Sequence, residues 1–130
     1  MKILQPQNWA RPRGFSNGVA AKGQLIFVSG MIGWDAQCKL VANDFVGQTR
    51  QALMNIIQVL AEAKAKPEHI TRMTWYVVDK REYLDASKEV GVVYREIIGS
   101  HYPAMTAVEV ASLVEDKARV EIEVTAVIPE

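Results

Sequence analysis

The chain has 130 residues, which is the size of one domain with a substantial hydrophobic core. Its 15 Lys and Arg residues equal its 15 Asp and Glu residues in number, so it lacks the basic excess that is typical of nucleic-acid-binding domains. An apolar fraction of 49% and a charged fraction of 23% exclude a disordered chain. We therefore expect a single domain over residues 1–130 and no nucleic-acid partner.

The N-terminus and the cysteine count bear on the compartment. Cys38 is the only cysteine, so no intrachain disulfide can form. The opening Met-Lys-Ile-Leu-Gln-Pro lacks the apolar run of a secretory signal, and no segment approaches the roughly 18 apolar residues of a membrane span. These features predict a cytoplasmic protein that has no membrane partner.

The first quarter of the chain predicts two short strands. Residues 1–14 show no clear period and are predicted to be an extended lead-in. Residues 19–21 and 25–30 have the composition of strands, and Lys22-Gly23 between them predicts a tight turn, since glycine accepts a positive φ.

Two amphipathic helices follow. Asp44 is a suitable N-cap for a helix in which apolar residues recur at three- and four-residue steps, and which ends near residue 65, before Pro67. A second stripe of apolar residues predicts a helix over residues 81–98, with Gly99 just beyond its end.

Three further strands complete the pattern. Residues 70–78 alternate and are rich in Thr, Trp, Tyr and Val, which favours a strand between the two helices. Residues 105–113 and 119–128 predict the last two strands, joined by a turn at residues 115–117. The predicted order is β-β-α-β-α-β-β, which indicates an α+β fold with two helices on one face of a sheet.

The second face of this sheet needs a cover. Residues 25–28 and 73–78 carry apolar or aromatic side chains on both faces of their strands. Two helices cover only one face, and the chain has no further element to offer. We therefore predict that another copy of the chain covers the second face, an association that a net charge of zero does little to oppose.

Several segments occur in the order and spacing of a known family. They are Phe15-Ser16-Asn17-Gly18-Val19, Ile26-Phe27-Val28-Ser29-Gly30, Gln51-Ala52-Leu53-Met54-Asn55-Ile56, Tyr76-Val77-Val78-Asp79, Tyr102-Pro103-Ala104 and Val120-Glu121-Ile122-Glu123. Through them the chain resembles the Rid family, also called YjgF or endoribonuclease L-PSP, from about residue 13 to residue 128.

This resemblance implies a fold and an activity. The fold would be similar to that of the small bacterial chorismate mutases, with a mixed sheet that carries two helices on one face. Three subunits would pack their sheets into a barrel-like homotrimer with a pocket at each interface. The implied activity is hydrolysis of reactive imines and enamines, such as 2-aminoacrylate, to a ketoacid and ammonia, without cofactor or metal. Some members act on 2-aminomuconate, and others have been described as ribonucleases or translation inhibitors.

The resemblance also assigns site positions. Ser29 and Gly30 match a turn whose backbone assists the substrate, and Glu121 matches the glutamate that positions the attacking water. In the deaminase branch an arginine directly after the Pro-Ala step clamps the substrate carboxylate. Met105 stands at that position here, and a thioether cannot pair with a carboxylate.

Other positions depart from the same pattern. Phe15 stands where the family has a tyrosine, Lys88 aligns with an asparagine of the second helix, and Ala107 aligns with a cysteine. We expect a more apolar pocket that accepts a larger or flatter ligand, lined by Phe15, Met31, Trp34 and Met105. The candidates for a replacement positive charge are Arg13 and Lys88.

These residues also have structural interpretations. Glu121 lies on the polar face of its strand, where a solvated or ion-paired glutamate is common, and Met105 could instead pack at a subunit interface. Ser29 has no His and Asp partner in the sequence pattern, which argues against a nucleophilic serine. His69 and His101 lack metal-ligand spacing and are predicted to be surface or packing residues.

The sequence therefore predicts a Rid-type hydrolytic deaminase whose imine or enamine substrate differs from 2-aminoacrylate, with an aminomuconate-like compound as a candidate. The missing arginine favours an alternative, a trimer whose interface pockets bind a small metabolite without turnover. A ribonuclease is disfavoured, because the chain has neither excess positive charge nor a basic patch interleaved with aromatic residues.

Overall fold

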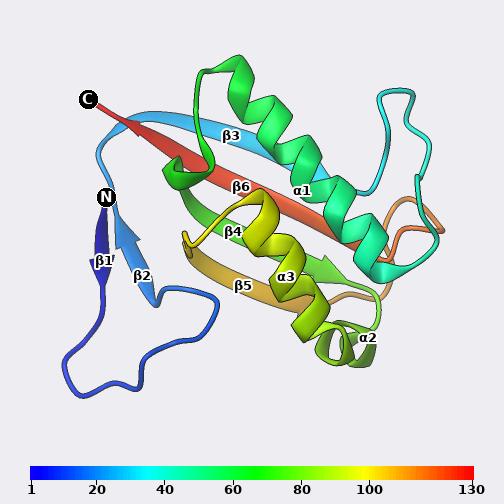
Figure 1. Ribbon diagram of the computed structural model, residues 1–130, viewed down its shortest axis with the longest axis horizontal. Coiled ribbons are helices and arrows are strands. Elements are labelled where there is room, and N and C mark those ends of the chain that lie inside the picture. Colours follow the sequence, from blue (N-terminus) through cyan, green and yellow to red (C-terminus); the bar gives the residue numbers. More distant parts are fainter.

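A four-stranded mixed sheet forms the centre of the computed structural model, which describes residues 1–130 (Figure 1). The strand order is β3 (Gly23–Met31), β6 (Val120–Pro129), β4 (Ile70–Val77) and β5 (Ala104–Glu109). β6 pairs antiparallel with both of its neighbours, whereas β4 and β5 are parallel. The two edges of the sheet are therefore β3 and β5.

The helices lie on one face of this sheet (Figure 1). α1 (Phe45–Glu62) packs across β3 and β6, and α3 (Ser87–Ile97) lies beside it. The predicted N-cap is confirmed, because the Asp44 carboxylate accepts a hydrogen bond from the Gly47 amide at 3.0 Å. A short 3₁₀-helix, η1 (Pro67–His69), follows α1.

The second predicted helix is divided in two. α2 (Lys80–Asp85) is capped by Asp79, and Ala86 separates it from α3. Ala86 has φ −89° and ψ 3°, so the chain turns between the helices, and the apolar stripe of residues 81–98 does not belong to one straight helix. The periodic pattern remains readable because α2 and α3 pack their apolar sides toward the same core.

The core lies between the helices and the facing side of the sheet. Leu53, Ile56 and Leu60 of α1 are fully buried there with Met73 and Ile122 of the sheet. The predicted alternation along β6 is confirmed, since its residues at even positions from 120 to 126 are buried and those at positions 121, 123 and 125 are only half-buried. Burying the three α1 side chains alone stabilises the fold by about 2 kcal/mol each.

The N-terminal prediction was partly wrong. The lead-in contains a strand, β1 (Lys2–Leu4), which pairs with β2 (Gly18–Ala20) in a separate two-stranded sheet. β2 and β3 therefore do not form a hairpin, because β3 pairs with β6, almost a hundred residues away in sequence. Gly23 does adopt a positive φ of 150°, and a Cβ there would overlap the carbonyl group of Ile128, so glycine permits this close start of the β3–β6 pair.

The face of the sheet away from the helices is apolar at its edges and polar in its middle. Leu25 and Phe27 of β3 are 57% and 73% exposed, and Val108 of β5 is 40% exposed. Between them the Tyr76 hydroxyl donates to the Glu123 carboxylate at 2.5 Å. The structure thus confirms the α+β class and shows an exposed apolar surface at β3.

The end of β5 differs from the predicted one. β5 ends at Glu109 rather than near residue 113, and residues 110–119 form the loop that contains the predicted turn. No helix in the structure has the length and the apolar character needed to cross a membrane.

Candidate functional site

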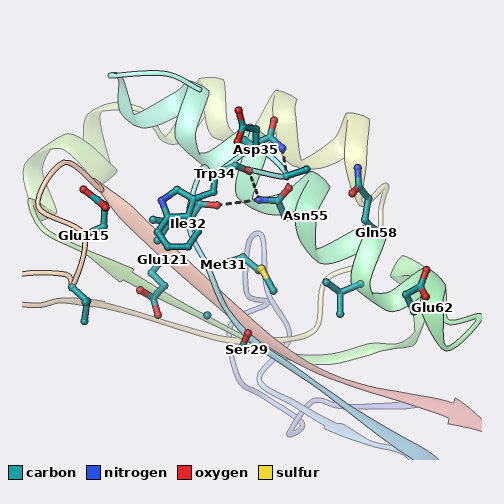
Figure 2. A pocket seen from close by; sticks show the side chains of 15 residues that line it. Ser29, Met31, Ile32, Trp34, Asp35, Asn55, Gln58, Glu62, Glu115 and Glu121 are labelled. Atoms are coloured by element: carbon teal, nitrogen blue, oxygen red, sulfur yellow. Dashed lines mark hydrogen bonds between the residues drawn. The ribbon is translucent and has the colours of Figure 1, made fainter. Parts of the chain in front are cut away.

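One cavity brings together five of the predicted site residues (Figure 2). It has a volume of about 860 Å³ and lies between the end of β3, the outer side of α1 and the loop before β6. The predicted residues that line it are Ser29, Gly30, Met31, Trp34 and Glu121. We call this cavity the β3 cavity.

The Glu121 carboxylate lies directly against Gly30. A Cβ on Gly30 would overlap Glu121 Oε2 and would stand 2.7 Å from Glu121 Cδ. Gly30 does not have a positive φ, so its backbone conformation does not require a glycine. A glycine is required for this close approach because any side chain would collide with Glu121. The β3–β6 register shifts between Val28 and Met31, and such a bulge re-aims the side chains and the backbone next to it.

The loop that carries Trp34 is fixed to α1 by an asparagine that the sequence reasoning missed. Asn55 Nδ2 donates to the carbonyl oxygens of Ile32 at 3.2 Å and of Trp34 at 2.8 Å (Figure 2). Gln51 Nε2 in turn donates to Asn55 Oδ1 at 2.8 Å. Two signals were available, namely the positions of Gln51 and Asn55 four residues apart beside the apolar stripe of α1, and their place in a segment that carries the family resemblance. This network holds one wall of the β3 cavity in place.

The charges of the β3 cavity are all negative. Its four ionisable lining residues are Asp35, Glu62, Glu115 and Glu121, and no Lys or Arg lines it. The cavity therefore offers carboxylates that can orient or deprotonate a water, but no group that would hold an anionic substrate.

A second cavity, of about 440 Å³, brings together four other predicted residues. They are Arg13, Phe15, Met105 and Ala107. The cavity lies between α3, the β4–β5 edge and the segment before β2, and we call it the β5 cavity. No Asp or Glu lines it, in contrast to the β3 cavity.

The N-terminal segment is attached to β5 by Ser16. The Ser16 amide donates to the Pro103 carbonyl at 2.9 Å, and its hydroxyl donates to the Tyr102 carbonyl at 2.5 Å. Ser16 is also bridged to Ala104, the first residue of β5. These contacts explain how Arg13 and Phe15 come to line the same cavity as Met105, ninety residues later.

Tyrosines form a neutral, aromatic wall of the β5 cavity. The rings of Tyr94 and Tyr102 stack with centroids 5.4 Å apart, and the Tyr94 hydroxyl donates to the His101 carbonyl at 2.7 Å. Burial, with a smaller contribution from Tyr102, raises the pKa of Tyr94, and burial also raises the pKa of Tyr83. Both phenols therefore stay protonated at neutral pH.

Lys88 is placed in neither cavity. It lies exposed on α3, whereas Ser87 and Gly91 of the same helix line the β5 cavity. The lysine that the resemblance aligned with a site asparagine thus points to a different part of the helix surface. Its role in the site stays a prediction that the structure does not favour.

Several polar side chains outside the two cavities make contacts within the fold. The hydrogen bond to Glu123 is the main reason why the pKa of Tyr76 is raised. Glu109 accepts from the amide of Lys80 at 2.8 Å, which places its charge at the start of α2. His69 Nδ1 accepts from the amide of Lys66. No group of three or more His, Cys, Asp or Glu side chains is arranged to hold a metal ion.

The predicted site residues that line a cavity are therefore divided between the two edges of the sheet, at β3 and at β5. The β3 and β5 cavities have no lining residue in common, and β6 and β4 separate the two edge strands. The carboxylate chemistry lies in one cavity and the positive charge in the other. Neither cavity of a single chain contains a complete site for an anionic imine.

A mixed sheet in the order β3-β6-β4-β5, with helices on one face, is the fold of the Rid type, and the predicted site residues lie at both edges of this sheet. A model of the family described as Endoribonuclease L-PSP matches residues 8–128, and the chain belongs to this family.

The relatives carry Rid, RutC and deaminase descriptions. The chain is 30% identical over 126 residues to the RutC family protein PH0854 of Pyrococcus horikoshii, with 96% of each chain covered. It is 32% identical over 108 residues to the 2-iminobutanoate/2-iminopropanoate deaminase of Salmonella typhimurium, covering 81% of this chain and 80% of that one. The family therefore includes imine deaminases.

The fold agrees with that of a solved member of the family. YyfB of Yersinia pestis, described as a protein of unknown function of the conserved Rid family, superimposes with a TM-score of 0.84. The two chains are 28% identical, and 98% of each is covered. This similarity extends across both edges of the sheet, where the two cavities lie.

Proposed function

We propose that this protein is a hydrolytic deaminase of the Rid type, acting on an imine or enamine larger than 2-aminoacrylate. The observation that carries the proposal is the Glu121 carboxylate, held against Gly30 at the β3 bulge inside a cavity. Ser29 and Gly30 lie within β3, at its register shift, and not in the turn that was predicted for them. A carboxylate beside this exposed backbone is suited to orienting one water and receiving its proton.

The reaction needs no group that the chain lacks. A water bound to Glu121 attacks the carbon of the protonated C=N bond, and Glu121 accepts one proton from it. The resulting carbinolamine carries one OH group and one amino group on the same carbon. Glu121 passes its proton to the nitrogen, and the C–N bond breaks to release ammonia. The Glu121 carboxylate then takes the proton of the hydroxyl group, so that the oxygen becomes the carbonyl of the product.

We further propose that three copies assemble so that β3 of one lies near β5 of the next. Joining two different edges is a heterologous contact, which closes into a ring when the rotation permits. The exposed Leu25 and Phe27 of β3 and Val108 of β5 support such an interface, as does the division of the site between the two edges. The resemblance to a trimeric family supports three copies.

The free, exposed Cys38 fits the cytoplasm that the sequence predicts.

The lining of the β5 cavity supports a substrate larger than 2-aminoacrylate. Met105 and Ala107 present small or flexible apolar groups there, and Phe15 and four further aromatic residues surround them. A volume of about 440 Å³ exceeds the needs of a three-carbon acid.

A metabolite-binding trimer without turnover is the second candidate. It is favoured by Met105, which cannot pair with a carboxylate at the position where the deaminase branch has an arginine. The same cavities would then bind the ligand without placing its reactive carbon against a water.

The test is release of ammonia from 2-imino acids generated in situ by an amino-acid oxidase, from alanine and from phenylalanine, and from 2-aminomuconate. We expect turnover of at least one of the larger substrates, and a loss of kcat of about 100-fold or more in Glu121→Gln. Glu123→Gln is the matched control, because Glu123 lies two residues away on the same strand and lines neither cavity.

The outcomes separate the two candidate functions. Ammonia release that depends on Glu121 and not on Glu123 supports the deaminase. Thermal stabilisation by the product ketoacids without any ammonia release from these substrates supports the binding protein. Equal activity in wild type and Glu121→Gln contradicts the proposed role of the carboxylate.

A further inference from the structure

Arg95 of α3 lines the β5 cavity, although neither the family motif nor the sequence pattern singled it out. Its Nη1 lies 3.5 Å from the position that a Cβ on Gly91 would occupy. Gly91 is one helical turn earlier, so the Arg95 side chain runs back along α3 toward the cavity. The guanidinium group therefore lies over the Gly91 position, at an ordinary contact distance.

Arg95 and Arg13 are both free of protein partners. The two ion pairs of the structure join Arg50 to Glu96 and Arg119 to Glu82, and no side-chain hydrogen bond involves Arg13 or Arg95. The carboxylate adjacent to Arg95 in sequence, Glu96, is thus paired with another arginine. Because no acid lines the β5 cavity, its two guanidinium groups have no counter-charge within the chain.

Aromatic residues form a large part of the remaining lining of the cavity. Five rings line it, those of Phe15, Trp75, Tyr83, Tyr94 and Tyr102. Trp75 is only 3% exposed, and its indole Nε1 is buried without a hydrogen-bond partner. Flat ring faces favour a planar ligand.

We propose that Arg95 and Arg13 bind the carboxylate of a planar ligand in the β5 cavity, with the ligand an aromatic or conjugated 2-imino acid. The rings contact the flat, unsaturated part of the ligand, and the guanidinium groups bind its carboxylate. Met105 of β5 lines the same cavity, but its thioether cannot bind a carboxylate. This inference rests on the proposed function, because it names the substrate class of that site and its carboxylate-binding residues.

The binding step can be tested without turnover. Isothermal titration of the wild-type protein with phenylpyruvate is compared with titrations with pyruvate, which lacks the ring, and with phenylacetone, which lacks the carboxylate. We expect phenylpyruvate to bind at least 10-fold more tightly than either. Arg95→Gln should weaken phenylpyruvate binding by about 10- to 100-fold and leave phenylacetone binding unchanged, since a charge-assisted bond to a carboxylate is lost.

Matched variants show whether the effect is local. Arg13→Gln should also weaken phenylpyruvate binding, and Arg95→Lys should restore part of it, because charge is kept but the bidentate geometry is not. Arg81→Gln is the control, since Arg81 is an exposed arginine of α2 that makes no ion pair and lines neither cavity. Its removal should leave both affinities unchanged.

Kinetics distinguish this inference from the proposed function. Arg95→Gln should raise KM for the phenylalanine-derived imine and leave kcat within about threefold, whereas Glu121→Gln should lower kcat. Carboxylate-dependent binding without turnover would uphold this inference and reject the deaminase. Phenylpyruvate binding that is undetectable in wild type, or equally tight in wild type and both arginine variants, would overturn it.

Discussion

Gly30→Ala is a sharp test of the site, because it adds one methyl group against the groups that the proposed mechanism needs. The new Cβ would overlap Glu121 Oε2 and would stand 2.7 Å from Cδ and 2.9 Å from Cγ of the same side chain. Ordinary contacts begin at 3.4 Å, so Cδ must retreat by roughly 0.7 Å and the closer Oε2 by roughly 1.4 Å. The neighbour is the end of a flexible side chain, so the carboxylate moves and the backbone does not.

A displacement of about 1 Å in a group that positions a reactant costs on the order of 100-fold in rate. We therefore expect Gly30→Ala to lower kcat/KM for imine hydrolysis by about 10- to 100-fold. The free energy of unfolding should change by less than about 1 kcal/mol, because Gly30 has no positive φ and the three atoms nearest the methyl group all belong to the Glu121 side chain. Ammonia release and thermal denaturation measure the two quantities on the same samples.

A double-mutant cycle identifies the cause. If the methyl group acts through the carboxylate, Gly30→Ala should cost less than about threefold when Glu121 is already glutamine, because the displaced group no longer takes part. The reasoning is refuted if the alanine variant keeps wild-type kcat/KM, or if it loses the same factor in both backgrounds.

Three further predictions concern other parts of the molecule. Met105→Arg should create hydrolysis of 2-iminopropanoate by adding a cation beside Ala107; a folded variant without this activity would show that the other departures also matter. Phe27→Glu should release monomers, detected by light scattering, and abolish turnover, since a charge replaces the most exposed apolar side chain of β3; an active oligomer would contradict the proposed interface. Glu123→Gln should lower the raised pKa of Tyr76 toward 10, observed by ultraviolet titration, because the bond to the carboxylate favours the protonated phenol. In the wild type, the contribution of the Tyr76–Glu123 hydrogen bond to stability should be lost as pH rises above the ordinary tyrosine pKa. A Tyr76 titration that is unchanged in Glu123→Gln would show that this hydrogen bond does not raise the pKa.

Periodic features of the sequence predicted the elements well. The stripe of α1 and its Asp44 cap, and the alternation along β6, follow from local spacing, which folding leaves intact. The partner of β3 did not follow, because its side chains alternate in the same way whether it pairs with β2 or with β6. Pairing depends on which distant strand presents the matching apolar face, and the residue pattern of β3 does not indicate which strand that is.

The sequence motif brought together residues that line one cavity, but it did not indicate the arginine that we propose as a binding residue; whether either set forms the functional site stays a prediction. Ser29, Gly30 and Glu121 do line one cavity, as the resemblance implied. Arg95 was missed, although a glycine stands one helical turn before it, because many exposed arginines follow helical glycines without entering a cavity. Lys88 was chosen as a cation on the same helix, but the folded helix turns it away from the cavity.

A net charge of zero conceals two opposite local charges. The β3 cavity has four acidic residues and no cation, whereas the β5 cavity has two arginines and no acid. In the proposed ring these two edges face each other, so their charges attract one copy to the next. They also orient an imino acid, since its carboxylate is repelled by the β3 side and held by the arginines of the β5 side. The C=N carbon is then left toward Glu121 and its water, which is the arrangement that hydrolysis requires.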